Sequence, residues 1–488
     1  MTVRPPKIRF PIFPQRRFDQ VALSVVLILG VILGIIIWHG DQTRLRVTRF
    51  SWQGEKVGVQ DKFFTLNFNR PVDPDSVESN LMIDPPLLGR SSWQGNNLVY
   101  TLSETPIYGT NYQVKLDKAN RIDQQGTMEP FVNLFSTRDR TLAYVGVSNE
   151  ERGRLILYDI TNPKQPKKTI LTPKDLVASQ FRIAPTGDKI FFLGFDPRLG
   201  TSSKQLFSVT TGIKYSLSAP DVTPGKLERV LDNRDYDNLS FDLSRDGKTF
   251  ILLRVNRQNK ADSGLWIIPD GASPRPLGVP AKDFIIAPDG NKLAVASQGG
   301  VGLIPLNVEA GSSRLLAGYT KALAFSKDGK RLLLTQENAD YTRSLILMES
   351  DGKTQEILRN MYPILDCQFE PRQEKVLYCL RTDVVKREDG NYHEEPFLSV
   401  VQLDTWQDQP LLALPNYRDV QMSLSPDGTS LLFDQVATTA PMSSRDLLTP
   451  SNQAITDARV WMLPLPDAKT QSVLPKELTP GFFPKWMP

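Results

Sequence analysis

The chain has 488 residues, too many for one ordinary hydrophobic core, so two or three domains are expected. Its hydrophobic content of 40% and charged content of 23% are typical of folded globular protein and exclude general disorder. A formal net charge of +4 over this length excludes the dense basic face that nucleic-acid binding needs.

The chain has only two cysteines and two histidines, which restricts the chemistry it can carry. A four-ligand zinc site would need all four residues, and their spacing fits no known zinc pattern. A catalytic triad or a Cys-His pair would need His39, at the edge of an apolar segment, or His393, in a polar loop. No hydrolase, metalloprotease, Walker A or dinucleotide motif is present. The sequence therefore predicts no enzyme and assigns no catalytic, cofactor-binding or metal-binding residue.

Residues 21–38 form an uncharged apolar run, VALSVVLILGVILGIIIW. At about 1.5 Å per residue, a helix over this run would reach about 27 Å, just enough to cross a hydrocarbon core. The run is longer than a usual signal-peptide core, and the following WHGDQTR has no small-residue cleavage site. The sequence thus predicts a transmembrane helix at residues 21–38 that contacts the lipid bilayer.

Basic residues lie on both sides of this run, for example Arg16 and Arg17 before it and Arg44 and Arg46 after it. The positive-inside rule favours residues 1–20 as a cytoplasmic basic tail by a thin margin, and charge alone does not settle the orientation.

Residues 44–138 alternate apolar and polar side chains in short runs, such as FFTLNFN at 63–69 and NNLVYTL at 96–102. Alternation at period two predicts half-buried strands, and turn-forming clusters separate the runs. Strands at this spacing over this length predict a β-sandwich.

Several short motifs in this span resemble a known family. They are Pro71-Val72-Asp73, Ser76-Val77, Trp93, Tyr108-Gly109-Thr110-Asn111-Tyr112 and Phe135-Ser136-Thr137. They resemble the bacterial Ig-like domain of the S-layer SbsA type. This resemblance implies a spacer domain outside the cytoplasm.

Residues 140–488 repeat one phrase: an apolar strand, a tight turn and a second apolar strand. The turns carry Asp246-Gly247, Asp289-Gly290, Asp328-Gly329 and Asp427-Gly428, with a variant at Pro185 to Gly187 and a degenerate copy at Arg372-Gln373. Asp bonds back to its own backbone, and Gly takes the positive φ that closes a hairpin. A third and a fourth strand follow each hairpin, which is typical of β-propeller blades.

Counting the strand pairs predicts a seven-bladed β-propeller, with six blades as the alternative. The first copy lacks its innermost strand, and the last residues resemble that strand. We therefore expect Phe482 to Trp486 to pair with the blade at Leu142 to Ile160 and to close the ring, which removes an exposed sheet edge.

The turn phrases Ser425-Pro426-Asp427-Gly428 and Pro288-Asp289-Gly290 resemble the WD40-like repeats of the TolB family of periplasmic propellers. This resemblance implies the fold, and it says little about function because propellers serve many roles.

Three insertions interrupt the regular spacing, at 211–238, 383–396 and 436–458, and such loops on a rigid scaffold are where partner contacts are expected. The first contains Asp232, Asp235 and Asp237, and alternate acidic residues can bind calcium. The Gly and Glu positions of an EF-hand loop are missing, so a solvated turn is the favoured interpretation.

Cys367 and Cys379 lie on consecutive strands of one hairpin, an even number of residues apart, so both project from one face. If the turn centres on Gln373, they are directly opposed and could form a disulfide. If the register follows the other copies, they are offset diagonally and remain two buried thiols.

The sequence as a whole predicts an all-β protein with an N-terminal transmembrane helix. Its domains are a basic tail (1–20), the helix (21–38), an Ig-like sandwich (44–138) and a TolB-like propeller (140–488). The expected function is that of a single-pass scaffold of the bacterial inner membrane whose extracytoplasmic propeller binds an envelope protein or a glycan. The alternatives are a propeller hydrolase or lyase with a site in the central funnel, and an accessory subunit of a membrane complex. The last rests on Gly30 and Gly34, which would permit close helix contact.

Overall fold

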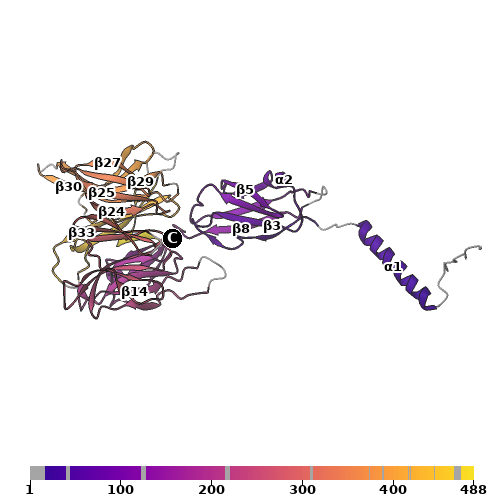
Figure 1. The fold of residues 1–488 in the computed structure, drawn as a ribbon, viewed down its shortest axis with the longest axis horizontal. Helices are drawn as coiled ribbons and strands as arrows, with labels where there is room; N and C mark the ends of the chain where they lie inside the picture. The colour runs from indigo at the N-terminus through magenta and orange to yellow at the C-terminus, as the bar shows by residue number, and fades with distance from the viewer. Residues whose placement is uncertain are drawn as a thin grey trace, which may run out of the picture.

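The computed structural model consists mainly of strands, with one long helix on the N-terminal side (Figure 1). It describes residues 17–39, 44–122, 128–214, 220–307, 311–372, 374–386, 390–415, 417, 419–443, 446–465 and 474–488. Within the first of these ranges, side chains are described from residue 20 to residue 35.

Helix α1 covers Arg17–His39. Across the described part of the chain, no helix combines the length and the apolar character needed to cross a bilayer. The prediction of a transmembrane helix at residues 21–38 is therefore wrong. The predicted basic tail, residues 1–20, lies almost wholly outside the described residues.

The first domain is a β-sandwich of two four-stranded sheets, as the alternating pattern predicts. One sheet has the order β1-β3-β6-β5, with bounds Val47–Phe50, Phe63–Phe68, Asn97–Leu102 and Gly89–Gln94. The other has the order β2-β8-β7-β4, with bounds Lys56–Val57, Phe131–Thr137, Asn111–Leu116 and Leu81–Asp84. A short helix, α2, covers Pro74–Glu78. Alternate residues, such as Phe64 and Leu66 of β3, point into one shared core.

The second domain contains seven four-stranded antiparallel sheets within the described residues. Blade 1 combines β36 (Phe482–Trp486), β9 (Thr141–Val145), β10 (Leu155–Asp159) and β11 (Lys167–Ile170). Blade 2 is β12 (Val177–Ile183), β13 (Lys189–Phe195), β14 (Gln205–Thr210) and β15 (Leu227–Leu231). Blade 3 is β16 (Tyr236–Leu243), β17 (Phe250–Asn256), β18 (Ser263–Ile268) and β19 (Arg275–Pro276). Blade 4 is β20 (Asp283–Ile286), β21 (Lys292–Ser297), β22 (Gly300–Pro305) and β23 (Arg314–Leu316).

The remaining blades follow the same order. Blade 5 is β24 (Tyr319–Phe325), β25 (Arg331–Glu337), β26 (Arg343–Glu349) and β27 (Thr354–Asn360). Blade 6 is β28 (Ile364–Phe369), β29 (Val376–Lys386), β30 (Tyr392–Gln402) and β31 (Asp408–Ala413). Blade 7 is β32 (Met422–Leu424), β33 (Ser430–Thr439), β34 (Ala454–Pro464) and β35 (Lys476–Pro480). Inner strands of neighbouring blades lie against one another, so the sheets form a ring and the seven-bladed prediction is confirmed.

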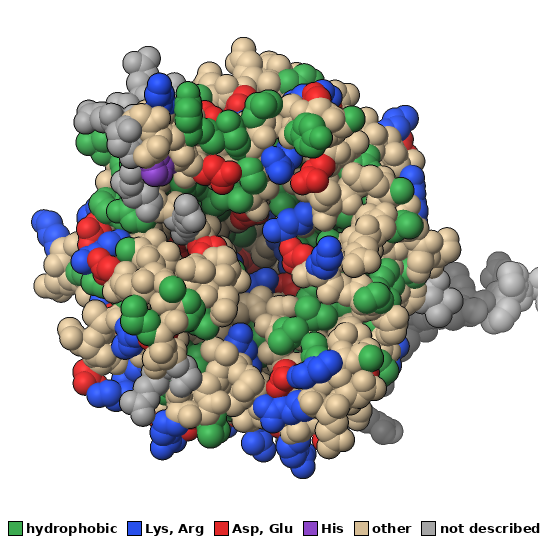
Figure 2. Space-filling view, turned by 90° about the vertical axis from the view of Figure 1, so that its left-hand side faces the viewer, with side chains coloured by type: hydrophobic (Ala, Val, Ile, Leu, Met, Phe, Trp, Pro, Cys, Tyr) green, Lys and Arg blue, Asp and Glu red, His purple; other side chains and the backbone are tan. Residues whose placement is uncertain are grey.

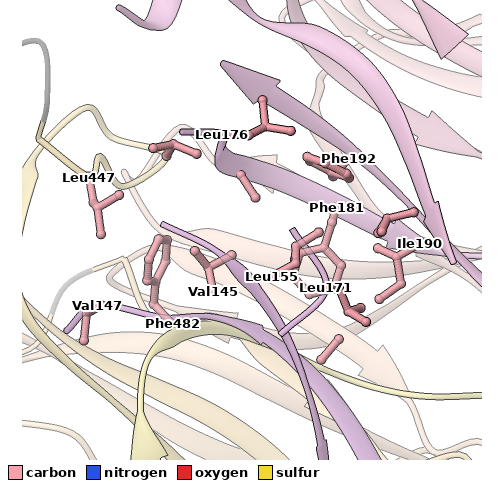
Figure 3. Close-up of a cluster of buried hydrophobic side chains, with 14 of the residues drawn as sticks. Val145, Val147, Leu155, Leu171, Leu176, Phe181, Ile190, Phe192, Leu447 and Phe482 are labelled. Carbon is pink, nitrogen blue, oxygen red and sulfur yellow. The ribbon is translucent and has the colours of Figure 1, made fainter. Parts of the chain in front are cut away.

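Strand β36 closes this ring. It pairs antiparallel with β9, placing Phe482 opposite Val145 and Trp486 opposite Leu142. Phe482 also enters the large apolar cluster between blades 7, 1 and 2, where it lies beside Val145 and Leu447 (Figure 3). The expected closure by Phe482 to Trp486 is confirmed.

The repeated turns have the geometry that their residues predict. The glycines of the five Asp-Gly or Gly-Asp turns all have a positive φ, between 67° and 73°. In the turn at Asp328, the carboxylate accepts hydrogen bonds from the Ser326 hydroxyl (2.7 Å) and from the Lys330 N–H (3.0 Å). A Ser two residues before the Asp thus locks the turn before the second strand begins.

Cys367 and Cys379 are directly opposed across β28 and β29 and form a disulfide. The alternative of two free thiols is therefore not observed. The bridge is fully buried in the core of blades 5 and 6.

Candidate functional site: the channel and distal face of the propeller

The two ends of the propeller differ in what they face. In an antiparallel meander, successive hairpin turns alternate between the two ends of the sheet. The Asp-Gly turns, which join the first and second strands, therefore all lie at one end, here called the sandwich end because the first domain packs there (Figure 1). The opposite end, here called the distal end, carries the turns between the second and third strands.

The contact between the domains uses one of the repeated turns. The Asp427 carboxylate accepts a hydrogen bond of 3.0 Å from the Tyr108 N–H of the sandwich, and both groups are buried. Lys56 of the sandwich pairs with Asp139 in the connection between the domains. The turn phrase that builds a blade thus also fastens the sandwich to the propeller.

A central channel of about 760 Å³ opens at the distal end and is lined by inner strands of all seven blades. Figure 2 shows this end of the molecule, with a hollow in which acidic and basic side chains face one another. Side chains close the gaps between neighbouring inner strands. The Gln180 amide exchanges hydrogen bonds with the Phe241 backbone, and Asp242 accepts one from the Ile286 N–H at 3.1 Å. These contacts satisfy backbone groups that have no strand partner at the channel wall.

Some charges of the channel wall are paired between blades. Arg182 of blade 2 lies 2.8 Å from Asp242 of blade 3, and Lys321 of blade 5 lies 3.3 Å from Asp283 of blade 4. Asp366 accepts a hydrogen bond from Gln368 at 2.9 Å, and removal from water raises its pKa. The two ion pairs therefore fix neighbouring blades to one another.

Lys485 of β36 lies between the two cavities of the propeller. It lines both the distal channel and a second cavity at the sandwich end. Burial lowers the pKa of its ammonium to about 8, nearby Arg182 acts in the same direction, and Asp366 and Asp242 oppose them.

Asp434 is a buried acid behind the channel wall. Its two oxygens accept hydrogen bonds from the Gln421 N–H (2.6 Å) and the Phe483 N–H (2.8 Å), so it joins β32, β33 and β36. Burial raises its pKa to about 7 in spite of these two donors. The signal in the sequence is an Asp within the otherwise apolar run LLFD.

The contribution of Asp434 to the free energy of unfolding should fall as the pH rises from about 4 to about 7. Because its pKa is raised on folding, the native state holds a proton in this window that the unfolded chain has lost. The stability this proton confers is complete below about pH 4 and is lost as pH rises through about 7. Denaturant unfolding at several pH values should show a shallower pH dependence for Asp434→Asn than for wild type. The exposed Asp289→Asn is the control, and identical pH profiles for wild type and Asp434→Asn would contradict the prediction.

The distal end presents exposed apolar side chains. They lie in or beside the turns and blade connections at that end: Leu199, Tyr341, Met361, Tyr392 and Met442. We call these five side chains the distal rim. Tyr341 and Met442 are each 87% exposed, which is unusual for side chains of this size.

Two of the three sequence insertions have described residues at this end. Residues 383–386 and 392–396 form the ends of β29 and β30, which at 11 residues each are longer than the 7-residue β25 and β26 of blade 5. The described residues of 436–458 include the ends of β33 and β34 and a loop whose Leu447 to Pro450 line the channel mouth. Leu447 is buried in the cluster of Figure 3, so this loop is anchored at the mouth. Of the insertion at 211–238, the described residues 211–214 and 220–226 follow β14 at the sandwich end, and β15 comes next.

Other residues singled out from the sequence do not assemble a site. Asp232 pairs with Arg234 at 2.6 Å, and Asp237 pairs with Arg257 at 2.8 Å. Among the described residues, no group of three or more His, Cys, Asp or Glu side chains could hold a metal ion. His393 lies on β30 opposite Val385, and the side chain of His39 lies outside the described residues.

No protein-family model matches the chain, and no curated protein matches it in sequence. Solved structures of similar fold include TolB from Acinetobacter baumannii, with 13% identity and a TM-score of 0.38 over 68% of this chain and 80% of that one. A functionally unknown protein from Desulfotomaculum acetoxidans shares 11% identity, with a TM-score of 0.39 over 69% of this chain and 94% of that one. A prolyl endopeptidase shares 10% identity, with a TM-score of 0.44 over 76% of this chain and 49% of its own. At these identities and scores the similarities carry no argument about function.

Proposed function

We propose that this protein is a binding scaffold whose distal propeller face holds a partner protein, while the sandwich supports the propeller from the other side. The observation that carries the proposal is the distal rim: five large apolar side chains exposed at one end of the propeller. Tyr and Met side chains are enriched at protein–protein interfaces, and aromatic side chains there often become buried anchors.

The channel chemistry supports binding rather than turnover. Arg182 and Asp242, and Lys321 and Asp283, neutralise each other between blades. Paired charges of this kind hold the channel wall rigid and are already engaged within the protein.

The disulfide between Cys367 and Cys379 supports an extracytoplasmic location. Structural disulfides persist in oxidising compartments and are rare in the reducing cytosol. An envelope location would also agree with the resemblance of the sandwich to bacterial Ig-like domains and of the turn phrases to TolB-type repeats.

Photo-crosslinking tests the proposal. A benzophenone amino acid at Tyr341, Tyr392 or Met442 should trap the same discrete protein, identified by mass spectrometry. The same probe at Phe63, an exposed position on the sandwich, is the matched control and should not trap it. Alanine at Tyr392 and Met442 together should reduce recovery of that protein at least about tenfold, because interface anchors each contribute roughly 1–2 kcal/mol.

Two outcomes would overturn the proposal. Equal trapping from the rim and from Phe63 would show that the rim is not a specific surface. Recovery of a glycan, or turnover of a small molecule in the channel that Tyr392→Ala leaves unchanged, would assign the distal end a different role.

A further inference from the structure

A second cavity, of about 870 Å³, lies between the sandwich and the sandwich end of the propeller. We call it the interdomain chamber. Val59, Gln60 and Arg138 line it from the sandwich side, and the repeated turns of several blades line it from the propeller side. Its volume lies within the range of small-molecule sites, and such sites occur preferentially where domains meet.

The chamber contains three cations without an ion pair among the described residues: Arg245, Lys327 and Lys485. The Arg245 guanidinium donates to the Lys327 carbonyl oxygen at 3.1 Å, which holds the two residues together without forming an ion pair.

The two carboxylates that line the chamber have other partners. Glu374 pairs with Arg331 at 2.8 Å and accepts the Lys327 N–H. Asp246 accepts the Ser244 hydroxyl at 2.5 Å and the Lys248 N–H at 3.0 Å, within its own turn. Neither acid is therefore paired with Arg245, Lys327 or Lys485.

The cations affect one another. Burial lowers the pKa of Lys327, the nearby cations Arg245 and Lys62 lower it further, and Glu374 and Glu370 oppose them without reversing the shift. Burial also lowers the pKa of Arg245, and Glu374 opposes it. Like charges held together and partly removed from water cost free energy, and an anion placed between them would relieve that cost.

The walls of the chamber are apolar beside these charges. Phe325, Phe369 and Trp486 supply aromatic surface, and Ile183 and Leu243 supply aliphatic surface. Phe325 and Leu243 come directly before the turns that carry Lys327 and Arg245, so apolar and cationic surfaces adjoin along the same strands.

We propose that the interdomain chamber binds a small amphipathic anion, with a carboxylate or phosphate between Arg245 and Lys327 and an alkyl or aryl body against Phe325, Phe369 and Trp486. This site is separate from the distal rim and does not depend on it. Both a lipid headgroup with its chain and a soluble organic phosphate or carboxylate have this chemistry.

Calorimetric titration of the full chain tests the proposal with three probes. Octyl phosphate should bind with a stoichiometry of one, whereas octanol and inorganic phosphate should each bind at least about tenfold more weakly, because each lacks one half of the recognition. Vesicles containing phosphatidylglycerol then distinguish the sources: retention by vesicles identifies a lipid, and its absence identifies a soluble anion.

The double variant R245Q/K327Q should weaken octyl phosphate binding at least about tenfold. The variant R275Q/K353Q removes the same charge from exposed positions outside the chamber and should leave binding unchanged. F325A should weaken octyl phosphate binding while leaving the response to inorganic phosphate unaltered. Failure of octyl phosphate to bind wild type, equal binding of octanol, or equal loss in both double variants would each overturn the proposal.

Discussion

Replacing Phe482 with alanine is expected to lower the free energy of unfolding by about 3–5 kcal/mol, the usual cost of deleting a buried phenyl ring. Phe482 is 3% exposed and packs between the first and last blades, where Val145 and Leu447 surround it (Figure 3). Its loss would leave a cavity at the point where the ring is closed, so neighbouring blades could not easily collapse into it. Chemical denaturation monitored by tryptophan fluorescence measures the change.

Phe63→Ala is the matched control for this prediction. It deletes the same side chain from an exposed position of the sandwich, so a change within about 0.5 kcal/mol is expected. If the two variants lost similar stability, β36 would contribute little to closing the ring.

Replacing Asp427 with alanine is expected to cost about 2–3 kcal/mol and to loosen the sandwich from the propeller. The carboxylate accepts hydrogen bonds from the Ser425 hydroxyl (2.6 Å) and, across the domain boundary, from the Tyr108 N–H (3.0 Å). Removing it leaves buried donors without a partner, which is more costly than losing an exposed bond. Hydrogen exchange at the Tyr108 amide should become faster, and the connection at Asp139 should become easier to cleave by protease.

Asp328→Ala separates the two contributions. Asp328 holds the same position in the turn of blade 5 and accepts the equivalent Ser326 hydroxyl, but it is exposed and has no hydrogen bond to the sandwich. It should lose only the local turn bonds, at about 1 kcal/mol, with no change in exchange at Tyr108. Equal effects at both positions would mean that the contact with Tyr108 is energetically neutral.

The propeller could be predicted from the sequence because its defining interactions are local. Each hairpin is specified by an Asp-Gly turn and two apolar runs, so blade number and ring closure followed from counting them. The sandwich followed similarly from alternation in segments such as residues 63–69. The prediction of a membrane-spanning helix was wrong. It rested on the apolar run at residues 21–38, and no helix in the described part of the chain combines the length and the apolar character needed to cross a bilayer.

The disulfide shows where local patterns stop being sufficient. In a regular turn, the last paired residues before the loop are, for example, Ile183 and Ile190. In the degenerate copy the corresponding pair is Phe369 and Leu377, which lie one position further apart in the sequence. Its turn is therefore one residue longer, with Glu374 at a φ of 53° in the left-handed region. That one residue shifts the register and brings Cys367 opposite Cys379.

The channel and the interdomain chamber could not be predicted, because their side chains come from strands far apart in the sequence. Arg182, Asp242 and Lys485 each occupy an ordinary polar position of an alternating strand, and only the ring brings them together. The distal rim could be predicted in part, because Tyr392 and Met442 lie in two of the insertions seen in the sequence. The exposure of Leu199 and Tyr341 could not, because it depends on the finished fold.

Pairing β9, at residues 141–145, with β36, at residues 482–486, has a consequence for biosynthesis. During translation the sandwich emerges complete, while the first blade must wait for nearly the whole propeller before its inner strand arrives. Until then β9 presents unpaired backbone groups that any extended segment could occupy, so nascent or truncated chains should depend on holding factors and should associate through that edge. Such long-range pairing also places this domain among slowly folding topologies.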